Sequence, residues 1–147
     1  MHKRIMIVVN DQASCQCAIT QGIEMARVHR AEVVFLYVLP NYEYPEMNSI
    51  GVLSPDQFIR DAREVASRVL QAASVQAENS EVFSVSVVGT TEHPAVYVAE
   101  EADKRRCSLI VVATEGRNAV MRLLTGSIVP GLITNASVPV MVCPQET

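Results

Sequence analysis

The sequence lacks any apolar run near the roughly 18–20 residues that a membrane-spanning helix requires, although 49% of its residues are hydrophobic. The N-terminal apolar run, Ile5 to Val9, is too short for the core of a signal peptide, and no cleavage site follows it. The 147 residues suffice for one domain, 1–147, that buries a core without disulfides or a metal. We therefore expect a single-domain, cytoplasmic protein with no membrane partner.

Basic patches of the kind that bind nucleic acids are also missing. The net charge is −4, the pI is near 5.3, and the largest basic cluster is Lys104-Arg105-Arg106. Cations at such a point suit the C-terminal end of a helix, where they interact favourably with the helix dipole. Because a nucleic-acid-binding face normally carries more positive charge, we expect no nucleic-acid partner.

The cysteines lack the spacing of a zinc site or a redox dithiol. There are four, Cys15, Cys17, Cys107 and Cys143, and no histidine lies at ligand spacing from them. Cys15 and Cys17 are two residues apart, so on a helix they point in different directions. Buried, reduced thiols and no metal site are expected.

Two common catalytic motifs are also absent from the sequence, the phosphate-binding P-loop and the Gly-x-Ser-x-Gly nucleophile turn. No catalytic residue is therefore assigned.

What the chain does contain is a regular alternation of strand-like and helical segments. The expected strands are 5–9, 31–39, 82–88, 109–113 and 138–142. The expected helices are 13–30, a helix from Ser54 whose buried face carries Phe58, Ala62, Val65, Val69 and Ala72, then 94–106 and 127–135. Strict alternation predicts an α/β fold with a parallel sheet, helices on both faces and right-handed crossovers. The serine-interrupted strand 82–88 and the proline-containing strand 138–142 are expected at edges.

One stretch in the second half has the character of an anion site. Val111 and Val112 end a buried strand at Ala113, small residues lead to Gly116, and nine residues later Gly126-Ser127 starts a helix. Helix N-termini offer unpaired N–H groups and the positive end of the dipole, and glycine lets a phosphate approach the backbone. In open parallel sheets ligands bind beyond the carboxyl ends of the strands where the strand order reverses. We expect a crevice there, between Asn10 and Ala113.

Two other segments are less informative. The segment 41–54 has no period and carries tyrosines and asparagines near prolines. It is either a functional loop or a plain surface excursion. Gly89 to Pro94 is expected as a strand-to-helix turn, in which His93 either caps the helix, faces solvent or contacts a ligand.

Several motifs occur in an order that carries a resemblance to a known family. They are 5–10, 34–39, Pro94-Ala95, 109–116, Leu123-Leu124-Thr125-Gly126-Ser127 and Val138-Pro139-Val140. In this order the chain resembles the universal stress protein family over essentially its whole length. The family signature is Gly-x-x-Gly, nine residues, then Gly-Ser or Gly-Thr; here Ala113 replaces the first glycine and the spacing is intact. The resemblance implies an open sheet of five parallel strands in the order 3-2-1-4-5.

The resemblance also implies where a nucleotide would bind. It puts adenine contacts near Val9 and Val38, and Asn10 at the end of the first strand. The ribose and phosphates would rest on Val112, Ala113, Gly116, Gly126, Ser127 and Ile128. Ser127 can act either as a helix cap or as a phosphate ligand, and its backbone N–H serves the phosphate in both cases.

Three positions depart from the family pattern. Asn10 stands where the family usually has aspartate, so it accepts a hydrogen bond but supplies no charge for a magnesium ion. Ala113 adds a methyl group to the first glycine position. Glu115 stands where histidine, arginine or serine is common, and if it faces a phosphate about 4 Å away the repulsion costs on the order of a kcal/mol. Arg117 and Arg122 are available to offset it.

Two functions stay open. The favoured one is a stress-response protein that holds an adenine nucleotide, ATP or AMP, with or without Mg²⁺ and without rapid turnover. It would act as a homodimer through the C-terminal strand. The alternative is a nucleotide-free dimeric stress protein that acts through protein partners, which Asn10, Ala113 and Glu115 favour. A slow ATPase or phosphoryl carrier comes third. A response-regulator receiver is rejected, because Asn10-Asp11 and Gly89 replace its acidic residues.

Overall fold

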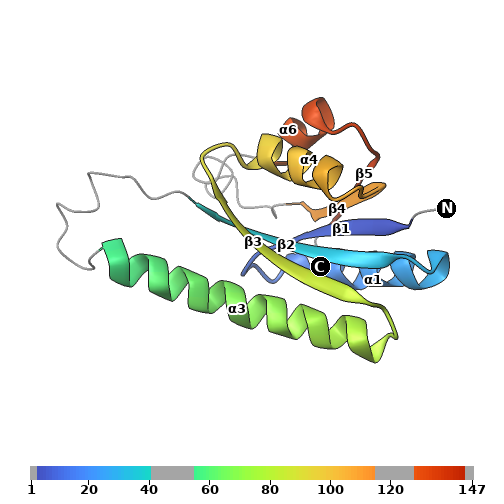
Figure 1. Ribbon diagram of the computed structural model, residues 1–147, viewed down its shortest axis with the longest axis horizontal. Helices are drawn as coiled ribbons and strands as arrows, with labels where there is room; N and C mark the ends of the chain where they lie inside the picture. Colours follow the sequence, from blue (N-terminus) through green and yellow to red (C-terminus); the bar gives the residue numbers. More distant parts are fainter. Residues whose placement is uncertain (1–2, 41–54, 115–127, 145–147) are drawn as a thin grey trace.

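The computed structural model describes residues 3–40, 55–114 and 128–144. Within these ranges five parallel strands form one sheet in the order β3-β2-β1-β4-β5, which confirms the expected topology (Figure 1). The strands are β1 (Arg4–Val9), β2 (Glu32–Pro40), β3 (Ser84–Thr91), β4 (Leu109–Ala113) and β5 (Val140–Cys143). The helices are α1 (Cys15–His29), α3 (Pro55–Asn79), α4 (Pro94–Lys104) and α6 (Ile128–Asn135).

The central strands are the ones with continuous apolar runs. In β1 the side chains of Ile5, Met6 and Ile7 are 0% exposed, and β1 pairs with β2 on one side and β4 on the other. A strand covered on both faces needs apolar residues at successive positions rather than alternate ones. The expected edge strands, β3 and β5, do lie at the edges. Pro139 sits just before β5 and contributes only its carbonyl, which accepts the Ile110 N–H at 3.0 Å.

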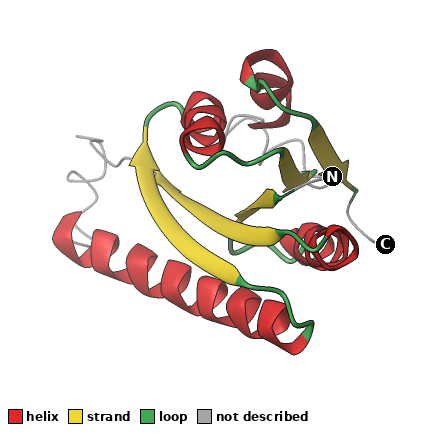
Figure 2. Cartoon of the chain, turned by 45° about the vertical axis from the view of Figure 1, so that its right-hand side comes forward, coloured by secondary structure: helices red, strands yellow, loops and turns green. Residues whose placement is uncertain are grey.

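The described helices form a layer on each face of the sheet. Figures 1 and 2 show α1 and α3 on one face and α4 and α6 on the other. Ile7, Phe35 and Val111 lie in the cluster under α1 and α3, whereas Met6 and Leu36 lie in the cluster under α4 and α6. Because successive strand residues point to opposite faces, one short apolar run supplies both layers.

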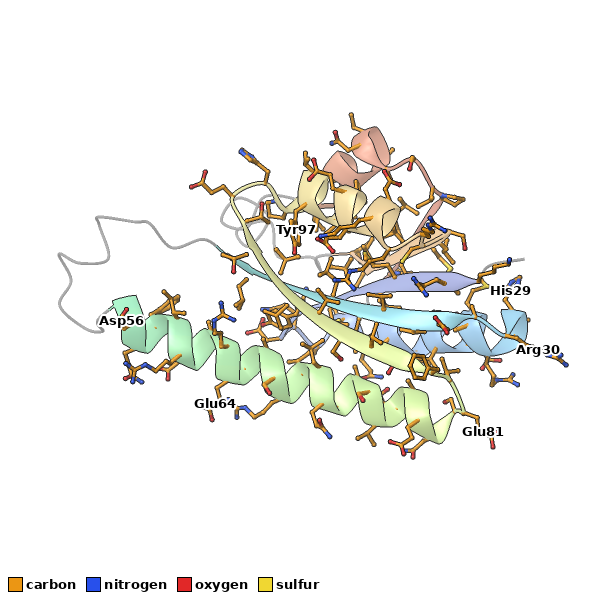
Figure 3. The ribbon with its side chains drawn as sticks, viewed as in Figure 1. His29, Arg30, Asp56, Glu64, Glu81 and Tyr97 are labelled. Carbon is orange, nitrogen blue, oxygen red and sulfur yellow. The ribbon has the colours of Figure 1, made fainter. Side chains whose placement is uncertain are left out.

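Three helix-to-strand connections share one backbone conformation. Arg30, Glu81 and Arg106 follow α1, α3 and α4 with positive φ angles of 54°, 59° and 57°; Figure 3 labels the first two. The next N–H in each case donates back to an alanine carbonyl, in the pairs Ala31 to Ala26 (2.8 Å), Val82 to Ala77 (2.9 Å) and Cys107 to Ala102 (2.8 Å). These bonds satisfy carbonyls that the helix end would otherwise leave unpaired. Glycine usually occupies this position, so the sequence carried no signal for the turns.

The buried face of α3 differs from the sequence-based expectation. Ala72, expected inside, is exposed, while the inward row consists of Ala66, Leu70, Ala73 and Ala77. Ala62 and Val69 pack at its border, as expected, and Val65 is half-buried. Because alanine side chains are small, they let the helix axis approach the sheet closely. The row that contains most of these alanines therefore faces the sheet, and the larger Val65 and Val69 side chains lie at the side of the helix.

Some boundaries also differ. Gly89, Thr90 and Thr91 were expected in a turn but belong to β3, because they continue its pairing with Val38, Leu39 and Pro40. Helix α1 starts at Cys15 instead of residue 13, and β5 starts at Val140 instead of residue 138. The underlying reason is that pairing with a neighbouring strand sets where a strand stops, and this pairing is not encoded locally.

Gly22 offers a test of how tightly α1 packs on the sheet. A Cβ at this position would overlap the buried Ile7 side chain and lie 3.7 Å from Val111 Cγ1. We expect Gly22→Val to lower the free energy of unfolding by about 1–3 kcal/mol through overpacking. Gln21→Val, on the exposed face of the same helix, is the matched control and should change it by less than about 0.5 kcal/mol. Urea unfolding measures both; equal midpoints for the two variants would contradict the close packing.

Candidate functional site

The strand order reverses at β1, since the chain proceeds outward from β1 to β2 and β3 and then returns to β4 on its other side. The register pairs Val9 with Tyr37 of β2 and Ile7 with Val111 of β4. The carboxyl ends of β1 and β4 are therefore adjacent. This is the location at which parallel α/β sheets generally bind ligands.

The expected site residues on the strands divide between the two faces of the sheet. Val9 and Ala113 belong to the cluster under α1 and α3, whereas Val38, Val112 and Ile128 belong to the cluster under α4 and α6. Val9 is 2% exposed and Val112 is 1% exposed. Their side chains are fully enclosed in the core, so a ligand at this edge would meet their backbone. Val38 and Ile128 are half-buried and have side-chain surface available.

Asn10 is held in the turn that connects β1 to α1. Its Oδ1 accepts the backbone N–H of Gln12 at 2.8 Å, and its own backbone N–H donates to Cys15 Sγ at 3.4 Å. The Cys15 thiol in turn donates to the Val8 carbonyl at 3.8 Å. Burial raises the pKa of Cys15, which keeps this thiol protonated and able to donate. The amide of Asn10 thus has a structural partner in the turn at the end of β1.

Tyr97 lies at the same edge, and sequence reasoning did not identify it. Figure 3 labels it on α4 beside the end of β3. Its ring covers Gly89 so closely that a Cβ there would overlap it, and Gly89 is paired with Val38. Partial burial, and then the neighbouring Glu101 carboxylate, raise the pKa of Tyr97, so the hydroxyl is neutral. An aromatic ring therefore stands next to the strand position expected to contact adenine. The available signal was a glycine in an edge strand shortly before an aromatic residue in the next helix.

The predicted phosphate segment falls outside the described residues. Gly116, Gly126 and Ser127 lie there, as do Glu115 and the loop 41–54. The described chain leads up to this segment at Thr114, whose N–H donates to the Cys143 carbonyl at 2.8 Å. It resumes at Ile128 in α6. His93, one of the open assignments, precedes α4 with an exposed side chain that makes no capping hydrogen bond.

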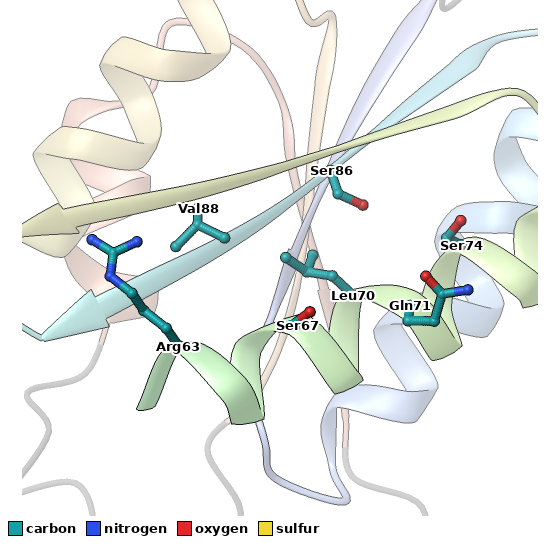
Figure 4. A pocket seen from close by; sticks show the side chains of 7 residues that line it. All are labelled: Arg63, Ser67, Leu70, Gln71, Ser74, Ser86 and Val88. Atoms are coloured by element: carbon teal, nitrogen blue, oxygen red, sulfur yellow. The ribbon is translucent and has the colours of Figure 1, made fainter. Parts of the chain in front are cut away.

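A concave feature lies away from this edge. It is a groove of about 310 Å³ between α3 and the edge strand β3, on the face opposite to α4. Figure 4 shows the side chains that line it. It is lined by Arg63, Ser67, Leu70, Gln71, Ser74, Ser86 and Val88.

Among the described residues, no group of three or more histidine, cysteine or acidic side chains could hold a metal ion. No described helix is long and apolar enough to cross a membrane.

The fold and this edge can now be compared with known proteins. The family model for the universal stress protein family matches residues 1–144, and the chain belongs to this family. A universal stress protein of Methanocaldococcus jannaschii is 27% identical over 145 residues, which cover 97% of this chain and 82% of the relative.

Solved structures share the fold at lower identity. The universal stress protein UspA from Lactobacillus plantarum superposes with a TM-score of 0.78 at 19% identity, covering 96% of this chain and 97% of that one. A family member from Arabidopsis thaliana, solved with AMP bound, has a TM-score of 0.67 at 18% identity, with coverage of 99% and 93%. Two further universal stress proteins with this fold were solved in complex with dAMP and with cAMP.

The role of Asn10 can be tested by two substitutions. Asn10→Ala removes the acceptor for the Gln12 N–H and should lower the free energy of unfolding by about 0.5–1.5 kcal/mol. Asn10→Asp keeps an acceptor oxygen in the same place and should stay closer to the wild type, since only charge is added. Urea unfolding at neutral pH distinguishes them. If Asn10→Ala unfolds at the wild-type midpoint, the turn does not depend on this side chain.

Proposed function

We propose that this protein binds an adenine nucleotide, ATP or AMP, at the carboxyl ends of β1 and β4 and holds it without rapid turnover. The observation that carries the proposal is the coincidence of two features at one edge. Strand β4 ends there and leads into the glycine signature with its nine-residue spacing, and the strand order reverses there. Family membership and relatives solved with AMP, dAMP and cAMP support the choice of adenine.

The adenine end of the nucleotide would lie toward β2. Val38 is half-buried and is paired with Gly89 of β3. Because Gly89 has no side chain, the Tyr97 ring packs directly over its backbone. Apolar surface with an aromatic ring beside it suits a purine base, which gains from burial and from ring contacts. Val9 and Asn10 would contribute backbone groups, because the Val9 side chain is buried and the Asn10 amide bonds to Gln12.

The phosphate end would lie toward α6. Gly126 and Ser127 immediately precede Ile128, the first residue of α6, so we expect their N–H groups to serve a phosphate at this helix N-terminus. Val112, Ala113 and Gly116 would supply the strand side of the same cradle. No carboxylate stands at Asn10 to hold Mg²⁺. A nucleotide here would therefore depend on backbone N–H groups more than on a metal. Because the sequence contains no catalytic motif beside the glycine signature, we expect ATP hydrolysis to be slow at most.

The alternative is a nucleotide-free protein that acts through partners. Asn10, whose amide is engaged in the turn, and Glu115, which adds negative charge near the phosphate segment, favour it. The intact spacing to Gly126-Ser127 favours the nucleotide.

Gly126 is the position where the two functions separate most sharply. Gly126→Val places a branched side chain where the phosphates would meet the backbone and should weaken ATP and AMP binding at least about tenfold, or about 1.4 kcal/mol. Titration calorimetry measures the affinity, and far-ultraviolet circular dichroism confirms the fold. Ser84→Val, on the distant edge strand β3, should bind like the wild type. Unchanged ATP affinity in Gly126→Val would refute this site.

We further propose that the protein is a homodimer paired through β5. This strand ends the sheet and consists of Val140, Met141, Val142 and Cys143, with no charge to discourage pairing with another edge. A two-fold axis would pair it antiparallel with the same strand of a second copy, which is the commonest closed symmetry.

Met141→Lys tests this interface, because a charge in an apolar seam must be desolvated on pairing. We expect light scattering at micromolar concentration to give a dimer mass for the wild type and a monomer mass, or insoluble protein, for Met141→Lys. Phe83→Lys is the matched control at the opposite edge, where Phe83 is 66% exposed, and should remain dimeric. A monomer mass for the wild type would rule the dimer out.

A further inference from the structure

Two of the four cysteines meet in space although they are distant in sequence. Cys17 lies in the first turn of α1 and Cys143 is the last residue of β5, and both belong to the hydrophobic cluster under α1. Helix α1 contacts β5, and the Cys17 side chain is near enough to the Cys143 thiol to act on its pKa. All four cysteines of the chain fall within the described residues and are free thiols. No spacing pattern indicates this pair, since its members are separated by most of the chain.

The other two cysteines face elsewhere. Cys15 bonds to the backbone of Val8 and Asn10 in the turn before α1. Cys107 lies in the separate cluster on the opposite face of the sheet, under α4 and α6. The two therefore provide natural comparison thiols, one two residues from Cys17 in sequence and one about as deeply buried as Cys143.

The two members of the pair differ in accessibility. Cys143 is 3% exposed, whereas Cys17 is half-buried and has surface that a small reagent can reach. Burial and the neighbouring Cys17 thiol raise the pKa of Cys143 to about 11, so at neutral pH it is protonated and gives up its proton when it attacks. An oxidant would therefore reach Cys17 first, and Cys143 is placed to attack whatever forms there.

We propose that Cys17 and Cys143 form a redox modification site that a hydroperoxide converts to an intramolecular disulfide. The Cys17 sulfur attacks the peroxide, the O–O bond breaks, and Cys17 becomes a sulfenic acid while one water leaves. The Cys143 sulfur then attacks the Cys17 sulfur, an S–S bond forms, and the hydroxyl leaves with the Cys143 proton as a second water. Two thiols and one hydrogen peroxide thus give one disulfide and two waters.

The position of this bond gives it a structural consequence. Cys143 is paired with Ala113, and its carbonyl accepts the Thr114 N–H at the point where the described part of β4 ends. The disulfide would tie the start of α1 to the end of β5 at the same edge of the sheet. It would also close a covalent loop over most of the chain, which restricts the unfolded state and opposes unfolding.

The experiment uses the full chain under native conditions with hydrogen peroxide as the probe. After removal of the peroxide, the protein is denatured, alkylated with N-ethylmaleimide and weighed intact, and its peptides are mapped without reduction. We expect a loss of about 2 Da before alkylation, two alkylated cysteines instead of four, and a Cys17–Cys143 linked peptide. Dithiothreitol should restore all four.

Variants assign the bond and keep the test independent of folding defects. Cys17→Ser, at the more accessible position, and Cys143→Ser should each form no intramolecular disulfide, whereas Cys15→Ser and Cys107→Ser should form it like the wild type. Peroxide should raise the urea midpoint of the wild type and leave that of Cys17→Ser unchanged. A disulfide that includes Cys15, a cross-link between two chains, or oxidation of Cys17 to sulfinic acid with Cys143 still alkylated would overturn the proposal.

Discussion

The parallel pairing of β1 between β2 and β4 is the constraint on which the rest of the structure depends. Ile5, Met6 and Ile7 are fully buried, so this strand is covered by helices on both faces and bonded on both edges. Its direction makes the carboxyl ends of β1, β2 and β4 meet at one edge. The turn at Asn10 and the start of the glycine-containing segment after β4 are brought to one edge by that single arrangement.

Most of the architecture could be predicted because its signals are local. Continuous apolar runs mark β1, β2 and β4, and serine alternation or Pro139 marks the edges. The predictions that were wrong concern features that depend on tertiary contacts. The inward face of α3 is a row of alanines that approach the sheet closely, and β3 continues through Thr91 because β2 is there to pair with it. The left-handed turns at Arg30, Glu81 and Arg106 use residues that carry no turn signal.

The strand positions of the candidate residues were predictable, whereas which of their side chains are exposed was not. Val38 and Ile128 have side-chain surface at the expected edge, whereas the Val9 and Val112 side chains are enclosed and can offer only backbone. Tyr97 was missed because its proximity to Val38 arises through Gly89, a contact between β3 and the following helix. Family membership is the source of the adenine hypothesis, and the amide of Asn10, which bonds to the Gln12 N–H, carries no charge for a metal ion.

The central claim is that an adenine nucleotide occupies the carboxyl edge of β1 and β4. The most direct measurement is mass analysis of small molecules released from the purified, denatured protein, followed by equilibrium dialysis of ligand-free protein against ATP, AMP and GTP. The account predicts release or retention of an adenine nucleotide at up to one per chain, with GTP retained far less. Absence of any released nucleotide, together with no retention of ATP or AMP at millimolar concentration, would contradict it and favour the nucleotide-free alternative.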